Sequence, residues 1–141
     1  MAAEEIQKFL QSKFPENPMA VESCANRRAR LRLDVDHTHL IPGRTVSGPT
    51  MMLLADTAVF AAILSTIGAV VLAVTTNLNI IFLRKPEPHR DLFGDSWLMK
   101  VGQRLIVGEV IIYSEDDPEP VAHATCTYSI PPGPNPTQDR C

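Results

Sequence analysis

The sequence predicts an α+β domain, in which an antiparallel β-sheet packs against one long helix. Three observations indicate this fold class. Residues 50–67 contain no proline, no glycine and a single charged residue, which is typical of a helix buried on nearly every face. Segments on both sides of this stretch alternate apolar with polar residues, as strands do. Polar or glycine-containing turns separate the later segments at the spacing of hairpins.

Length and composition indicate one globular unit. The chain has 141 residues, of which 45% are hydrophobic and 21% charged, so we expect a single domain over residues 1–131. Residues 132–141 are rich in proline and lack an apolar pattern, which predicts a flexible tail. The net charge of −3 gives no general case for nucleic-acid binding.

The cysteines and histidines indicate neither a metal site nor another cofactor site. The three cysteines are widely spaced and form no metal motif, which favours a reducing, cytoplasmic location. The first residues lack the apolar run of a signal peptide. His37 and His39 lack a third ligand in the sequence and precede a turn signal, so we expect them in a loop.

The N-terminal third predicts a short helix followed by strand structure. Residues 2–14 form an amphipathic pattern that ends at Pro15. The apolar stripe of this helix consists of Ile6, Phe9, Leu10 and Phe14. Residues 19–36 are expected to form one long strand or two short ones. Their outward positions from Arg27 to Arg32 form a basic stripe, which is either a solvated, cross-strand-paired face or a surface that steers phosphates.

The long helix has clear start and stop signals and one unusual residue. Ser47 is a good N-cap, Pro49 is tolerated in the first turn, and Gly68 supplies a stop. Asp56 is the only charge inside the helix. A buried, unpaired carboxylate is costly, so we expect Asp56 to face a cleft or a partner; a structural cap or ion pair is the alternative.

A membrane-spanning role is an alternative for the same region. The apolar run from Met51 to Val74 is long enough to cross a bilayer. A central aspartate such as Asp56 costs roughly 3 kcal/mol on insertion scales. Gly68 also splits the run, and no cluster of lysine or arginine flanks it. We therefore expect the buried helix of a protein without a membrane partner.

Four more strands are expected after the helix. They cover residues 70–83, 97–101, 104–114 and 121–130. The connector over residues 84–90 is mostly basic and has prolines on both sides of Glu87, which indicates a loop. The last strand alternates cleanly and places Cys126 and Tyr128 on its apolar face, where a cysteine is usually a small core residue rather than a nucleophile.

The helix and the turn before it resemble those of hotdog-fold acyl-CoA thioesterases, in the phenylacetate-degradation subfamily. That family carries His-Gly-Gly followed by an apolar helix, with an aspartate nine residues after the histidine. Here residues 47–49 read Ser-Gly-Pro, and residues 54–56 read Leu-Ala-Asp at that spacing. Residues 74–86 resemble the family's next strand, rich in threonine, asparagine and apolar residues and closed by proline. The resemblance extends loosely from about Ala20 to Pro131.

The resemblance implies a hotdog fold, a curved antiparallel sheet wrapped around the long helix. It also implies a homodimer or homotetramer in which Asp56 of one subunit faces the Gly48 amide of its partner. The implied reaction is hydrolysis of an acyl-CoA to the free acid and CoA. Gly48 would donate its backbone N–H to the thioester oxygen, Asp56 would act as general base or nucleophile, and Thr75 would hold the water or the carboxylate.

Other residues are expected to bind the substrate. Ser47, at the position of the motif histidine, is expected among them, and Met52 and Phe60 would line the acyl slot. Arg84, Lys85 and Arg90 flank the loop after the strand that carries Thr75, where they would hold the CoA phosphates or merely solubilise the loop.

Two positions depart from the family pattern. Ser47 replaces the motif histidine, although it can still cap the helix and so support the Gly48 donor. Ile41 replaces an asparagine that holds the attacking water in many relatives. These departures keep open a non-catalytic hotdog protein that binds acyl-CoA. A hotdog hydratase or dehydratase is a further alternative, but no histidine follows Asp56 before His89, whereas those enzymes pair the two closely.

Overall fold

The computed structural model describes residues 1–35, 40–41, 45–70 and 72–132. The expected histidine pair at 37 and 39 and most of the expected tail, residues 133–141, lie outside this part of the chain. The elements are, in chain order, α1 Ala3–Lys13, β1 Ala20–Ala25, β2 Arg28–Leu33, β3 Leu40–Ile41, β4 Thr45–Val46, α2 Gly48–Ile67, β5 Val74–Phe82, β6 Leu92–Val101, β7 Leu105–Ser114 and β8 Pro120–Ser129.

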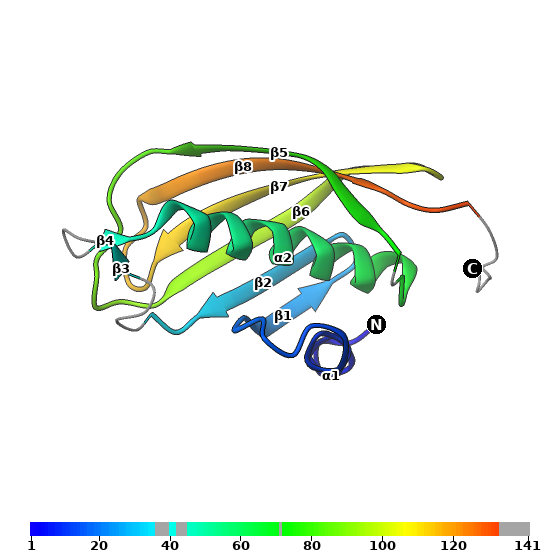
Figure 1. Cartoon of the computed structure of the whole chain (residues 1–141), viewed down its shortest axis with the longest axis horizontal. Coiled ribbons are helices and arrows are strands. Elements are labelled where there is room, and N and C mark those ends of the chain that lie inside the picture. Colours follow the sequence, from blue (N-terminus) through cyan, green and yellow to red (C-terminus); the bar gives the residue numbers. More distant parts are fainter. Residues whose placement is uncertain (36–39, 42–44, 71, 133–141) are drawn as a thin grey trace.

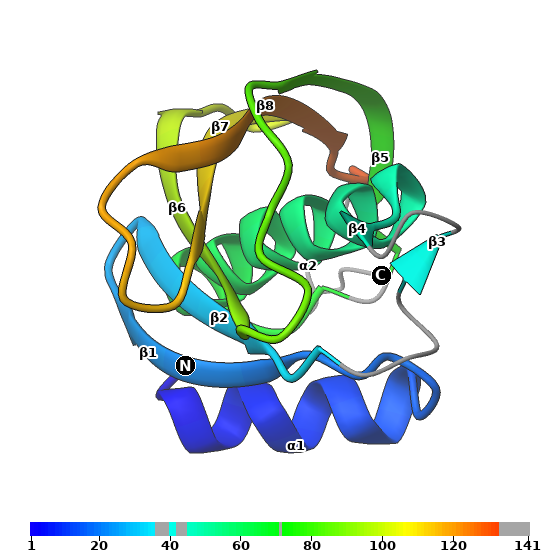
Figure 2. The same cartoon turned by 90° about the vertical axis from the view of Figure 1, so that its left-hand side faces the viewer.

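The strands form a curved antiparallel sheet around α2, as the α+β prediction requires. Six strands lie in the order β1-β2-β6-β7-β8-β5, and β3 pairs with β4 in a small separate ladder. Figure 1 shows α2 lying along the concave face of the large sheet, and Figure 2 shows α1 beside β1 at one edge of the molecule. This is the architecture that the resemblance to hotdog proteins implies.

The start and stop signals of α2 act as expected. The Ser47 side chain accepts a hydrogen bond from the Thr50 N–H at 3.2 Å. At the other end, the Gly68 N–H donates to the Leu64 carbonyl at 3.1 Å, and Gly68 adopts a φ of 86° that favours glycine. The helix is long and apolar enough to cross a membrane by composition. It is instead the core helix of the sheet, with Leu54, Ile63 and other apolar side chains fully buried.

The expected strand over 97–101 is wrong at its start, because β6 begins at Leu92. Gly94 and Ser96 hide the alternation in the sequence. Both face α2 where the helix lies close: a Cβ at position 94 would come within 3.2 Å of the Leu54 side chain. The Ser96 hydroxyl donates to the Ala58 carbonyl at 2.7 Å. Small residues here allow the close helix–sheet contact that larger apolar residues would prevent.

Residues 19–36 form two strands rather than one, joined by a turn at Arg27, which has a φ of 67°. Two of the four arginines in their basic stripe, Arg30 and Arg32, have carboxylate partners. Arg30 donates to both carboxylate oxygens of Asp95, at 3.1 and 3.0 Å, and Arg32 is bonded to Asp91 and Glu115. These pairs favour the structural interpretation of the stripe over phosphate steering.

The strand expected over 70–83 begins at Val74 and contains a β-bulge. Strict alternation places Thr75 on the face opposite Leu78 and Ile80. The register slips between Thr75 and Asn77, so Thr75 pairs with Tyr128 while Leu78 pairs with Cys126. The extra residue therefore brings Thr75 to the inner face of the sheet, toward α2.

Candidate active site

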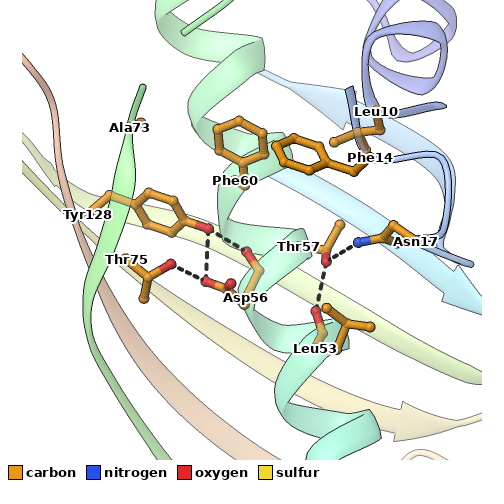
Figure 3. Close-up of a pocket in the computed structure, with 10 residues that line it drawn as sticks. All are labelled: Leu10, Phe14, Asn17, Leu53, Asp56, Thr57, Phe60, Ala73, Thr75 and Tyr128. Atoms are coloured by element: carbon orange, nitrogen blue, oxygen red, sulfur yellow. Dashed lines mark hydrogen bonds between the residues drawn. The ribbon is translucent and has the colours of Figure 1, made fainter. Parts of the chain in front are cut away.

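Asp56 lies where α2 meets β5 and β8, and neutral donors contact one oxygen of its carboxylate. Oδ1 accepts hydrogen bonds from the Thr75 hydroxyl at 2.7 Å and the Tyr128 hydroxyl at 2.8 Å (Figure 3). The Cys126 thiol lies 3.5 Å from the same oxygen. Among the described residues no lysine, arginine or histidine pairs with Asp56. This geometry does not support a structural ion pair for Asp56.

A mostly apolar cavity of about 250 Å³ opens beside Asp56. Its lining comes from α1 and the loop after it, from α2, and from the β5–β8 edge, and consists of Leu10, Phe14, Asn17, Leu53, Asp56, Thr57, Phe60, Ala73, Thr75 and Tyr128. Phe60 is central to it. Its ring stacks on Tyr128 at 5.7 Å between centroids and meets Phe14 edge-on at 5.9 Å. The Asp56 carboxylate thus borders a cavity that is suited to an apolar group.

The N-terminal segment contributes residues that sequence reasoning missed. We expected the first helix only from its apolar stripe, yet Leu10 and Phe14 line the cavity. Asn17 donates to the Thr57 hydroxyl at 2.9 Å, and Thr57 in turn donates to the Leu53 carbonyl at 2.8 Å. No local signal indicates the contact between Asn17 and Thr57, because these residues lie 40 positions apart.

The protonation of the neighbouring groups follows from burial and from the carboxylate. Burial raises the pKa of the Tyr128 phenol, and the nearby charge of Asp56 raises it further. Burial likewise raises the pKa of the Cys126 thiol, again with a smaller contribution from Asp56. Both groups therefore remain neutral donors at physiological pH, and Cys126 is not a nucleophile there.

A second hollow, of about 360 Å³, lies at the N-terminus of α2. It is lined by Val46, Gly48, Met51, Phe82, Leu83, Arg84, Lys85 and Pro86. Within the described residues, the Gly48 N–H has no hydrogen-bond acceptor. A free N–H at a helix start attracts an anion or a polarised oxygen. The hollow therefore combines a backbone donor with two cationic side chains.

Six of the nine expected site residues fall into two groups. Gly48, Arg84 and Lys85 share the hollow at the helix start, whereas Asp56, Phe60 and Thr75 border the cavity. Ser47 caps the helix, and Met52 and Arg90 line neither space. Asp56 lies eight positions after Gly48 along α2, which corresponds to a rise of about 12 Å along the helix axis. One chain therefore does not bring the donor and the carboxylate to the same atom.

Two of the expected cations have partners. Arg84 is bonded to the Asp117 carboxylate and donates to the Glu119 carbonyl at 3.1 Å. Arg90 donates to the Glu115 carbonyl at 3.3 Å. Lys85 is exposed and has no ion-pair partner among the described residues. Of the three, Lys85 is the most available for an added anion.

Comparisons of the sequence and of the structure with known proteins point to the same family. Residues 43–121 match the sequence profile of the thioesterase superfamily. The chain is 42% identical to a proposed thioesterase from Silicibacter sp. TM1040, over 92% of each chain and with a TM-score of 0.85. A comparison with curated proteins gives no match.

Two more distant structures share the fold. The PaaI protein of the E. coli phenylacetic acid degradation operon is 20% identical, with a TM-score of 0.75 over 90% of this chain and 94% of that chain. A Streptococcus mutans UA159 protein whose structure contains acetyl-CoA is 19% identical, with a TM-score of 0.72 over 80% of this chain and 88% of that chain. The hotdog fold is thereby confirmed. The chain belongs to the thioesterase superfamily, as the helix and its preceding turn predicted, and is a thioester hydrolase.

Proposed function

We propose that this protein hydrolyses an acyl-CoA to the free acid and CoA. The observation that carries the proposal is the Asp56 carboxylate, held by two hydroxyl donors at the edge of an apolar cavity. Water attacks the acyl carbon while Asp56 accepts its proton, the carbon–sulfur bond breaks, and the thiolate of CoA leaves and is protonated. Direct attack by Asp56, followed by hydrolysis of the resulting anhydride, is the other route open to this carboxylate.

The oxyanion donor in this proposal is the partner's Gly48. The distance along α2 separates the amide and carboxylate of one chain, so a second copy must supply one of them. The sheet offers a surface for that copy, since β5 is an edge strand, and the side chains of Ile81 and Phe82 at its end and of Leu83 just after it are about half exposed. An exposed apolar edge favours strand-to-strand pairing. We therefore propose a homodimer formed through β5, or a tetramer of two such dimers.

The acyl group would occupy the cavity between α1 and α2. We expect Phe14→Ala to enlarge this cavity and to shift the preference toward longer acyl chains. A filled apolar pocket discriminates added methylenes by roughly 10-fold or more, and the variant loses this restriction. The measurement is the ratio of kcat/KM for a longer and a shorter acyl-CoA.

Phe9→Ala is the matched control for this test. Phe9 also packs on Phe60, with centroids 6.5 Å apart, but does not line the cavity. Its loss should lower stability without changing the ratio. Equal ratios in the parent and both variants would contradict the assignment of the cavity.

The CoA phosphates would bind near the start of α2, where Lys85 adds a charge to the Gly48 hollow. The acetyl-CoA found in a structural neighbour supports a CoA thioester as the ligand class. We expect Lys85→Ala to raise KM several-fold with little effect on kcat, because a phosphate contact remote from the reacting carbon binds ground and transition states alike. Lys100→Ala, at an exposed lysine on β6, is the control. If both substitutions leave KM unchanged, Lys85 does not bind the phosphates and only keeps the loop hydrated.

A thiol-release assay with a panel of short, medium and aromatic acyl-CoA substrates tests the activity itself. Release of one thiol per acid is the expected result. Binding measured by calorimetry without thiol release would instead indicate a non-catalytic acyl-CoA-binding protein. The departures from the family pattern at Ser47 and Ile41 motivate this alternative. Water addition to an enoyl-CoA without thiol release would indicate a hydratase.

We also propose a cytoplasmic location. Both cysteines in the described residues, Cys24 and Cys126, are free thiols, and a reducing compartment preserves such thiols. Fractionation with an antibody against the native protein tests this location, and recovery from an oxidising compartment would contradict it.

A further inference from the structure

We infer that Tyr128 is a positioning residue, which fixes the Asp56 carboxylate so that Oδ2 is presented to the reacting water or acyl carbon. This inference rests on the proposed thioesterase function and adds a residue that the motif does not contain. Tyr128 lies on β8, opposite Thr75 on β5, and is only 4% exposed. Its hydroxyl lies 2.8 Å from Asp56 Oδ1 and 3.2 Å from the Asp56 backbone carbonyl.

The arrangement of donors is one-sided. Thr75, Tyr128 and the weak Cys126 donor all point to Oδ1, and none of the hydrogen bonds among the described residues involves Oδ2. A carboxylate held through one oxygen has a defined plane, and its other oxygen faces a defined direction. Fixing a reacting group in this way lowers the entropic cost of reaching the transition state.

Of the two hydroxyl donors, Tyr128 is the more rigid. Thr75 is exposed on the edge strand, where water can compete for the hydrogen bond between its hydroxyl and Asp56. The Tyr128 ring is buried and stacks almost parallel on Phe60, with an interplanar angle of 12°. The ring is therefore held independently of its hydroxyl group. The phenol also stays protonated at assay pH, because burial and the charge of Asp56 both raise the pKa of Tyr128.

Tyr128→Phe isolates this role, since it removes one oxygen and keeps the stacked ring. We expect kcat to fall about tenfold or more, as loss of a hydrogen bond to a charged group implies. KM should change less than twofold, because the cavity wall is retained. A purely structural tyrosine predicts the opposite result, a lower melting temperature with kcat intact when assayed well below that temperature.

Tyr113→Phe is the matched control, because the sequence contains only two tyrosines. Tyr113 lies on β7, and its hydroxyl makes no hydrogen bond within the described residues. This variant should match the parent in both kcat and KM. A Tyr128→Phe enzyme with parental kcat would overturn the inference while leaving the thioesterase activity established.

A second measurement does not depend on turnover. High-resolution crystal structures of the parent and of Tyr128→Phe give the orientation of the Asp56 carboxylate plane directly. One ordered carboxylate orientation in the parent and a rotated or disordered carboxylate in Tyr128→Phe are expected. The same ordered orientation in the two proteins would overturn the inference even if the parent hydrolyses no thioester.

Discussion

Asp56→Asn should lower kcat for thioester hydrolysis by about 100-fold or more, since a positioned base contributes at least that much. Asparagine has nearly the same shape and can still accept the hydrogen bonds of Thr75 and Tyr128 through its amide oxygen. It does not accept a proton from water or attack a thioester. The fold and the oligomeric state should therefore persist, and light scattering together with a melting curve checks this.

Asp95→Asn is the appropriate comparison. Asp95 lies on the outer face of β6 in an ion pair with Arg30 at 3.0 Å, so it represents the structural role that Asp56 could have had. Its substitution should change stability slightly, as partly exposed pairs do, and leave specific activity intact. If Asp56→Asn behaved like Asp95→Asn, with full activity and a lowered melting temperature, the catalytic assignment would be wrong.

Gly48→Pro should also abolish most of the activity, by about 10²–10³ in kcat, because it removes a main-chain donor to the developing oxyanion. The backbone at this point suits the substitution: Ser47 has φ −68° and ψ 149°, the conformation preferred before proline. Gly48→Ala is the control, since alanine keeps the N–H. Its Cβ would lie 3.3 Å from the ring of Phe82, a half-exposed side chain that can move aside.

Mixing the two inactive proteins tests whether the site is shared. Co-expressed Gly48→Pro and Asp56→Asn chains can be isolated as heterodimers through two different affinity tags. If Asp56 works with the partner's Gly48, each heterodimer contains one intact site of two and should recover about half of the parental activity. Recovery also shows that both variants fold. Heterodimers as inactive as either variant alone, or a parent that is monomeric at micromolar concentration, would contradict the shared site.

The fold was largely predictable because its strongest signals are local. The cap at Ser47 and the stop at Gly68 delimit α2 within the chain, and strict alternation identified β8. The failures occur where tertiary contact decides the residue. Gly94 and Ser96 are small because α2 lies against them, so the first half of β6 does not show a strand pattern.

The arrangement of the candidate site was predictable only in part. Spacing within one helix pointed to Gly48 and Asp56, and the family's strand pointed to Thr75, whose hydroxyl does bond to Asp56. Alternation correctly placed Tyr128 on the buried face, but it does not reveal that the hydroxyl meets a carboxylate 72 positions away. Likewise, the pairing of Arg84 with Asp117 depends on how two loops meet, which no local pattern specifies.

The apolar character of α2 has a consequence for biosynthesis. The helix is complete at Ile67, but β8, the last strand of the sheet that encloses it, ends at Ser129, which is 62 residues later. At translation rates of roughly 5–20 residues per second, this interval lasts about 3 to 12 s. Throughout it, β1 and β2 are the strands of the large sheet already complete, so part of a helix of bilayer-spanning length and composition remains exposed. During synthesis this segment therefore needs shielding from membranes and from other nascent chains. In the folded domain the sheet covers the segment, and this need disappears.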